Sequence, residues 1–248
     1  MTTPRHLKNP PITEALLDFR VDEGAGVSPA HLPQLRERVG SGYTRITEQE
    51  RFQASVEATP GRLPETRARN LGLFGWAFSS PDGRQVAQFR SDGFTLNRLA
   101  PYTSWPELFP EAMRLWKHYV QVVEPQAIRR MAVRYINHIK LDGLHVKLED
   151  YLRAPLPLPE GLPSTITSFL TSVVLHDEKA QSSVRVTQSL EPPHETQSLV
   201  FLLDIDAYSV VEKTPQDSTI EPTFEHLRTM KNNVFFSSLH EGIIARFA

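Results

Sequence analysis

Polar and apolar residues alternate most regularly between Arg129 and Leu141. A period of two is typical of a β-strand, because successive side chains point to opposite faces of a sheet. One face of this strand is apolar and holds Met131, Val133, Tyr135, Ile139 and Leu141. The other face holds Arg130, Arg134, His138 and Lys140, with Ala132 and Ile136 among them. We expect the first face to lie in a core and the second to meet water or a ligand.

Apolar residues at helical spacing predict two long helices, over 104–123 and 219–239. The first stripe consists of Trp105, Phe109, Ala112, Met113, Trp116, Tyr119, Val120 and Val123. The second stripe consists of Phe224, Leu227, Met230, Val234 and Leu239. The run Ser218-Thr219-Ile220-Glu221 has the pattern of a capping box and predicts the start of the second helix. We expect the helix at 104–123 to cover the apolar face of the strand at 129–141.

Shorter periodic segments predict the remaining elements. Strands are expected at 12–21, 43–58, 71–79, 84–90 followed by 94–99, 166–176, 183–190 and 198–211. Asp92-Gly93 interrupts the segment 84–99, either as a turn or as a bulge. A short helix is predicted after Ser28 and Pro29, and another at 148–152. Proline and glycine breakers predict a polar loop at 60–70.

The elements recur in the same order along the chain: a strand, a helix, three strands and a long helix, then this series again. The pattern predicts an α+β protein with two similar halves, 1–124 and 125–248, forming one compact unit. Each half is expected to be a mostly antiparallel sheet packed against a long amphipathic helix. Joined near Pro125, the halves would form one continuous curved sheet.

Composition excludes several classes of function. The chain has 248 residues, a net charge of −2 and no cysteine, so disulfides, thiolate catalysis and cysteine-based zinc sites are ruled out. A near-neutral charge argues against wholesale binding of nucleic acid or membranes, although a local basic face remains compatible with it. No apolar run reaches the roughly 18 residues of a membrane span, and the first residues lack the apolar core of a signal peptide. We expect a cytoplasmic, prokaryotic protein.

Two aspartates are candidates for a metal site. Asp204 and Asp206 share one face of a predicted strand, and with His138 they could hold a divalent ion. A metal-dependent hydrolase or nuclease would use these three residues. The alternative is that the aspartates mark the point where the strand emerges into solvent, or that they pair with arginines of the adjacent strand. Two carboxylates without a loop motif are a weak signal, so the pairing interpretation is favoured.

The basic residues Arg130, Arg134, His138 and Lys140 are a candidate site for an anionic ligand or nucleic acid. The competing interpretation is that they pair with Glu14, Asp18 and Asp206 across strands. The near-zero net charge favours pairing. A neutral His138 beside the arginines would suit a general base, but such a position is more commonly a half-exposed strand residue.

Five segments, spread over nearly the whole chain, carry a resemblance to a known family. They are Asn9-Pro10-Pro11-Ile12-Thr13-Glu14-Ala15, Tyr102-Thr103-Ser104-Trp105, Arg134-Tyr135-Ile136-Asn137-His138-Ile139, Leu203-Asp204-Ile205-Asp206, and Phe224-Glu225-His226-Leu227 through Asn233 to Phe236. With them the chain resembles an uncharacterised, sporadically distributed prokaryotic protein family of about this length, for which no activity is known. Where members tend to have Leu-His in the last helix, this chain has Leu227-Arg228, so a role for that histidine does not carry over. The element order also looks like the saddle-like sheet of TATA-box-binding protein and of helix-grip folds, an analogy of architecture alone.

No nucleophile elbow, phosphate loop or metal-ligand motif is found in the sequence. We therefore expect a non-catalytic binding or interaction module without a cofactor. Another protein is the expected partner. An anionic ligand or nucleic acid on the basic face, a metal-dependent hydrolase, and self-association remain open as alternatives.

Overall fold

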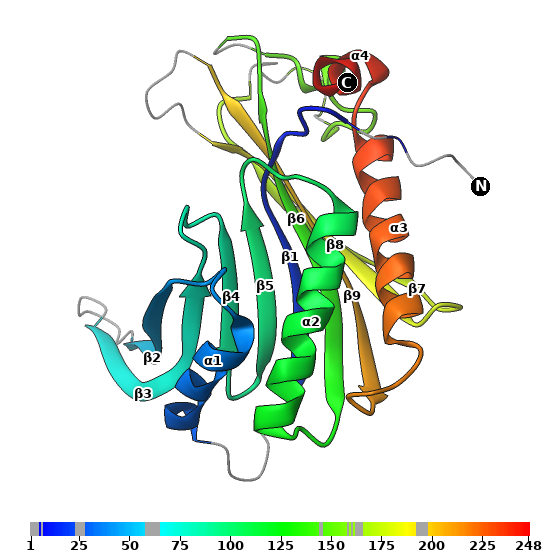
Figure 1. The fold of residues 1–248 in the computed structure, drawn as a ribbon. Helices are drawn as coiled ribbons and strands as arrows, with labels where there is room; N and C mark the ends of the chain where they lie inside the picture. Colours follow the sequence, from blue (N-terminus) through cyan, green and yellow to red (C-terminus); the bar gives the residue numbers. More distant parts are fainter. Residues whose placement is uncertain are drawn as a thin grey trace.

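The computed structural model is an α+β protein built on one nine-stranded antiparallel sheet (Figure 1). It describes residues 5, 7–22, 28–57, 65–143, 146–157, 159, 161, 166–191 and 198–248. The predicted α+β class and the antiparallel pairing are confirmed.

The strands are arranged in the order β2-β3-β4-β5-β1-β6-β9-β8-β7. Their bounds are β1 Ile12–Val21, β2 Arg45–Glu57, β3 Glu65–Ser79, β4 Gln85–Arg90, β5 Gly93–Leu99, β6 Ile128–Lys140, β7 Leu170–Asp177, β8 Ser182–Glu191 and β9 Val200–Lys213. The first and sixth strands lie side by side in the middle, paired in the register Leu17 to Val133 and Asp18 to Ala132. Consecutive hairpins thus build each side of the sheet outward, while β1 and β6 close its centre.

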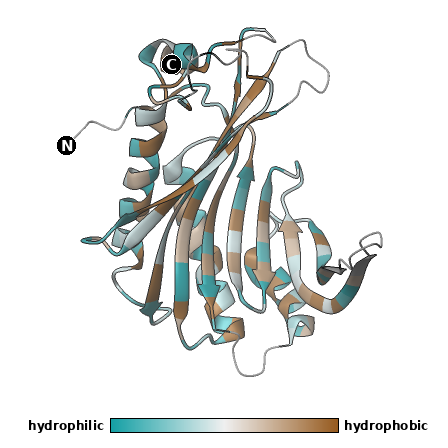
Figure 2. Cartoon of the chain, turned by 180° about the vertical axis from the view of Figure 1, so that it is seen from behind, coloured by the Kyte–Doolittle hydropathy of each residue, from teal (hydrophilic) through white to brown (hydrophobic). Residues whose placement is uncertain are grey.

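The helices include two long ones, which both pack on one face of the sheet, and several short ones (Figure 1). They are η1 Pro29–Gln34, α1 Leu35–Val39, α2 Trp105–Val123, η2 Leu148–Asp150, α3 Ile220–Ser238, α4 Glu241–Ile244 and η3 Ala245–Phe247. Seen from behind, the strands stand in front of α2 and α3 (Figure 2). In the described part of the chain no helix covers this second face, which we call the open face.

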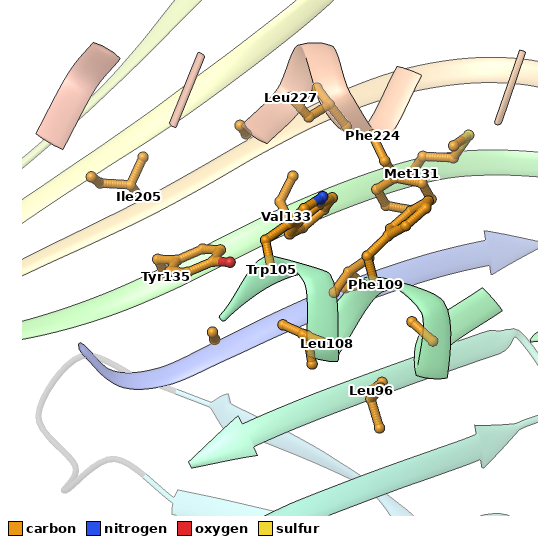
Figure 3. Packing of buried hydrophobic residues seen from close by; sticks show 14 of the residues in the cluster. Leu96, Trp105, Leu108, Phe109, Met131, Val133, Tyr135, Ile205, Phe224 and Leu227 are labelled. Carbon is orange, nitrogen blue, oxygen red and sulfur yellow. The ribbon is translucent and has the colours of Figure 1, made fainter. Parts of the chain in front are cut away.

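The core lies between the sheet and the helices. Met131, Val133, Tyr135, Ile139 and Leu141 are buried, as the alternation predicts. The Phe19 ring stacks on Trp116 at 4.0 Å between centroids and meets Phe224 edge-on at 5.0 Å, so both helices share one aromatic cluster. Figure 3 shows the buried side of β6 facing Trp105 and Phe109 of α2 and Phe224 and Leu227 of α3. The prediction that the helix at 104–123 covers the apolar face of this strand is therefore incomplete, because α3 packs on β6 as well.

Several predicted boundaries are wrong in detail. The polar loop expected at 60–70 is correct for none of the residues that can be checked, since 65–70 begin β3 and 60–64 lie outside the described residues. Asp92-Gly93 forms a turn rather than a bulge, because β4 and β5 pair antiparallel across it. The capping box does not form: Thr219 is the N-cap, and its side chain makes no capping hydrogen bond. Its hydroxyl donates to Asp217 instead.

Within the described residues, no helix combines the length and apolar character that crossing a membrane would require.

Candidate functional site

The open face carries a groove lined by charged and polar side chains of seven neighbouring strands, β4-β5-β1-β6-β9-β8-β7. Its main cavity measures about 580 Å³, and a second cavity of about 370 Å³ continues it toward β7. The main cavity is lined by Glu14, Leu16, Asp18, Arg20, Gln88, Arg90, Thr95, Asn97, Arg130, Arg134 and Asp206. The second adds Leu170, Ser172, Arg185, Thr187 and Asp204. We call both together the charged groove.

Asp18 of β1 is the centre of the groove. It is 4% exposed although no described helix covers it. Its Oδ1 accepts a hydrogen bond from the Thr95 hydroxyl at 2.6 Å and one from Arg90 Nη2 at 3.1 Å. Its Oδ2 accepts from Arg20 Nε at 3.1 Å and from Arg130 Nη1 at 3.3 Å. Three arginines from three strands therefore converge on one buried carboxylate, a charge-assisted network that fixes all four side chains.

A second row of ion pairs runs between β6 and β9. Both oxygens of Asp206 accept from Arg130 Nη2, at 2.9 and 2.7 Å. Asp204 accepts hydrogen bonds from Arg134 Nε at 2.8 Å and from Arg134 Nη2 at 2.6 Å, which form a bidentate ion pair. Burial raises the pKa of Asp206, and the nearby Arg130 opposes this rise. The hydrogen bonds with Asp204 raise the pKa of Arg134.

The four basic residues proposed from sequence are divided by the structure. Arg130 and Arg134 line the groove and are ion-paired. His138 is half-buried and stands opposite Leu202, further along the same strand face, and its backbone N–H donates to the Pro11 carbonyl. Lys140 is exposed at the end of β6. Neither His138 nor Lys140 is among the described residues that line the charged groove.

The proposed metal ligands also have arginine partners. Asp204 and Asp206 lie on one face of β9, as expected, and each is bonded to an arginine of β6. No group of three or more histidine, aspartate or glutamate side chains in the described ranges is placed to hold a metal ion. The aspartates would have to give up their guanidinium partners before they could bind a cation.

Two central residues of the groove were missed from sequence. Arg90 and Thr95 flank the β4–β5 turn, and both are buried at 5% exposure. They reach Asp18 because β5 pairs with β1, with Thr95 directly opposite Asp18. In the sequence, Arg90 is in phase with the polar Gln88, and Thr95 is in phase with the polar Asn97. This alternation places them on the polar face of a strand, but a single segment does not reveal that β5 lies next to β1.

Comparisons of the chain with family models, with curated proteins and with solved structures each found no match.

Proposed function

We propose that this protein is a non-catalytic binding module whose charged groove docks another protein. The observation that carries the proposal is the contrast between the sheet's two faces: helices cover one, while the other holds a preorganised array of arginine–carboxylate pairs in an open groove.

The energetic cost of the arginine–carboxylate pairs indicates that they serve to bind a partner rather than to stabilise the fold. Taking paired charges out of water costs several kcal/mol per ion, and apolar residues of similar volume are commonly as stabilising or more so. The side chains of Asp18 and Arg90 are each only 6% exposed, so they bear this cost. A network held in one geometry before a partner arrives, however, loses little side-chain entropy on binding.

The charge balance of the groove favours a protein over a polyanion. Four of the five arginines that line the groove pair with a carboxylate: Arg20, Arg90 and Arg130 with Asp18, and Arg134 with Asp204. Nucleic acid is attracted by an excess of unpaired cations, whereas a surface of alternating sign complements the mixed polar surface of a protein.

The proposal includes the organisation into two halves, 1–124 and 125–248. The strand series β1-β5-β4-β3 and β6-β9-β8-β7 run outward from the centre in corresponding order, which supports a pseudo-repeat. A 19-residue helix follows β5 in one series, and another follows β9 in the other. The groove would then lie across the junction of the halves, where Asp18 of one meets Arg130 of the other.

Affinity capture with a matched pair of variants tests the proposal. Arg134→Glu reverses a charge in the groove; Arg129→Glu makes the same change on the same strand outside it. Both arginines have side chains 43% exposed, and both hold an aspartate through Nε. We expect wild type and Arg129→Glu to retain one specific protein from the source organism, identified by mass spectrometry, and Arg134→Glu to lose it. Equal retention by both variants would contradict the proposal.

Wild type, Arg134→Glu and Asp204→Ala together test the two alternatives, a metal-dependent enzyme and a nucleic-acid site. Thermal stabilisation by a divalent metal that disappears in Asp204→Ala would favour the hydrolase or nuclease. Nucleic-acid binding that weakens steeply with salt and disappears in Arg134→Glu would favour a polyanion site on the basic face.

A further inference from the structure

A further cavity, separate from the charged groove, lies on the helix-covered side of the sheet. It is enclosed by α3, the residues that lead into α2, the N-terminal segment and β6. Its volume is about 130 Å³, room for several water molecules at about 30 Å³ each or for one small ligand. Its walls are largely aromatic and aliphatic, with three cations among them. It is lined by Arg5, Leu7, Pro10, Ile12, Tyr102, Thr103, Ser104, Trp105, Pro106, Tyr135, Asn137, Arg228, Lys231, Asn232, Phe235 and Phe236. We call it the Lys231 pocket.

Lys231 occupies a position that helical periodicity assigns to the core. The buried residues of α3 are Ile220, Phe224, Leu227, Lys231 and Phe235, a single stripe at spacings of three and four. Lys231 is 9% exposed, and its Nζ lies 3.7 Å from the centroid of the buried Tyr135 ring. A lysine at such a place costs free energy that a methionine or leucine would not.

The three cations of the pocket differ in their partners. Arg5 donates to both carboxylate oxygens of Glu241, and Arg228 pairs with Glu225 while lying over the Trp105 ring. The ammonium group of Lys231 has no hydrogen bond or ion pair with any described residue, and it lies over the Tyr135 ring. The described residues that line the pocket include no aspartate or glutamate.

The start of α2 strengthens the positive potential. Ser104 is the N-cap of this 19-residue helix, and its side chain does not cap the backbone. The first N–H groups of a helix have no partner within it and attract anions. Thr103, Ser104 and Trp105 bring this end of the helix to the wall of the pocket.

We propose that the Lys231 pocket binds a small organic anion, with its carboxylate or phosphate on Lys231 and its apolar body against Tyr102, Trp105 and Phe235. The site is separate from the charged groove and does not depend on the function proposed for it. A polymer does not fit a volume of this size, and an inorganic ion alone would leave the aromatic walls without a contact.

The ionisation of Lys231 agrees with this assignment. Burial, with a smaller contribution from Arg228, lowers its pKa to about 7. The titratable and charged groups around it are Arg228 and Glu225 of α3, Tyr135 of β6, Tyr102 and Glu107 at the start of α2, and Arg5 of the N-terminal segment. Burial raises the pKa of Tyr102 and of Tyr135, so both stay neutral at neutral pH. Binding of an anion should therefore be coupled to protonation of Lys231 alone.

Titration calorimetry with benzoate, phenyl phosphate and the uncharged benzamide tests the proposal on the full chain. We expect one or both anions to bind and benzamide to bind at least about tenfold more weakly, the difference that one charge-assisted hydrogen bond provides. Whichever anion binds more tightly identifies the headgroup as carboxylate or phosphate. The affinity for benzoate, whose charge is constant over this range, should decline as the pH rises from 6 to 8.5.

Two variants decide where the anion binds. Lys231→Met should weaken binding about tenfold or more and remove its pH dependence, while Lys117→Met, at an exposed position of α2, should leave both unchanged. Because Lys231→Met removes an unpaired buried charge, we expect it to fold. If neither anion binds the wild type, or if Lys231→Met binds as the wild type does, the proposal is wrong.

Discussion

Buried cations occur on both sides of the sheet, and their surroundings differ. On the open face, Arg90 contacts the carboxylates of Asp18 and Asp92, each at 3.1 Å. On the helix-covered face, Lys231 has a tyrosine ring below it and no carboxylate partner among the described residues. The open face thus balances its buried charges within the fold, whereas on the covered face the described residues leave one cation without a counter-charge.

The protein thus contains two kinds of buried charge: charges that are paired within the fold, and a cation without a carboxylate partner among the described residues. A paired network is self-sufficient, and loss of one member harms the others. An unpaired buried cation is a cost to the free protein, and only something outside the fold can offset it. Substitutions on the two faces should therefore have opposite effects on stability.

The largest effect is expected from Asp18→Ala. Removing this carboxylate takes away one of the two carboxylates that the buried Arg90 contacts, and the Thr95 hydroxyl loses the acceptor of its hydrogen bond. We expect the free energy of unfolding to fall by about 3 to 5 kcal/mol, the usual cost of breaking a buried ion pair. Urea denaturation followed by circular dichroism measures it.

A double variant tests whether the charge left behind is the cause. Asp18→Leu with Arg90→Met removes both partners, so no unpaired ion remains, and it should be less destabilised than Asp18→Ala. A double variant that is clearly less stable than Asp18→Ala would mean that the packing of the side chains matters more than their charge.

Tyr135→Ala is expected to have the next largest effect. The ring is fully enclosed, at 1% exposure, and its hydroxyl lies 3.0 Å from that of Tyr102. Truncating a large buried aromatic residue costs about 3 kcal/mol or more. Tyr135→Phe keeps the ring and should cost only about 1 kcal/mol, the net value of one hydrogen bond. Equal losses in the two variants would assign the effect to the hydroxyl pair.

The central strand illustrates what the sequence could predict. Alternation over Arg129–Leu141 separated its buried side chains from its polar ones, because a period of two depends only on neighbouring residues. The favoured pairing of basic and acidic strand positions was also a local inference, and Arg130 does contact Asp18 and Asp206. The identity of the partners was less accessible: Arg134 stands opposite Asp206 in the register but pairs with Asp204, two residues away on the same face of β9.

Other features depend on contacts between distant segments. Arg90 reaches Asp18 only because β5 lies beside β1, an arrangement set by the packing of the whole sheet. Lys231 is different, since its phase with Phe224 and Leu227 was visible in the sequence. The stripe was taken through Met230 and Val234 instead, both of which are only partly buried. A charged residue in phase with a helix's apolar stripe is a signal worth testing in such sequences.

Lys231→Met is expected to raise the free energy of unfolding, whereas Asp18→Ala and Tyr135→Ala lower it. With the pKa of Lys231 lowered to about 7 in the folded protein, the unfolded chain binds more protons between pH 7 and the normal lysine value of 10.5. The wild type therefore gains stability from this group as the pH rises through that interval, and below pH 7 it bears the full penalty. We expect the variant to be more stable by about 2 kcal/mol at pH 6, with the advantage shrinking toward pH 10. Thermal melts of ligand-free protein across this range measure the difference. A variant that is less stable at pH 6 would mean that Lys231 is already stabilised inside the fold.

Arg134→Ala is expected to change stability least. Its side chain is 43% exposed and that of its partner Asp204 is 14% exposed, and a pair whose cation is open to solvent contributes about 1 kcal/mol. Arg129→Ala, which removes an equally exposed arginine from the same strand, should have a similarly small effect in thermal melts. The two variants should differ in binding: Arg134→Ala should weaken attachment of the partner captured on the wild type, and added salt should weaken the wild-type complex as well. If Arg134→Ala instead lowers the melting temperature well beyond Arg129→Ala and leaves binding unchanged, the charges of the groove act as internal structure, and the partner must bind elsewhere on the molecule.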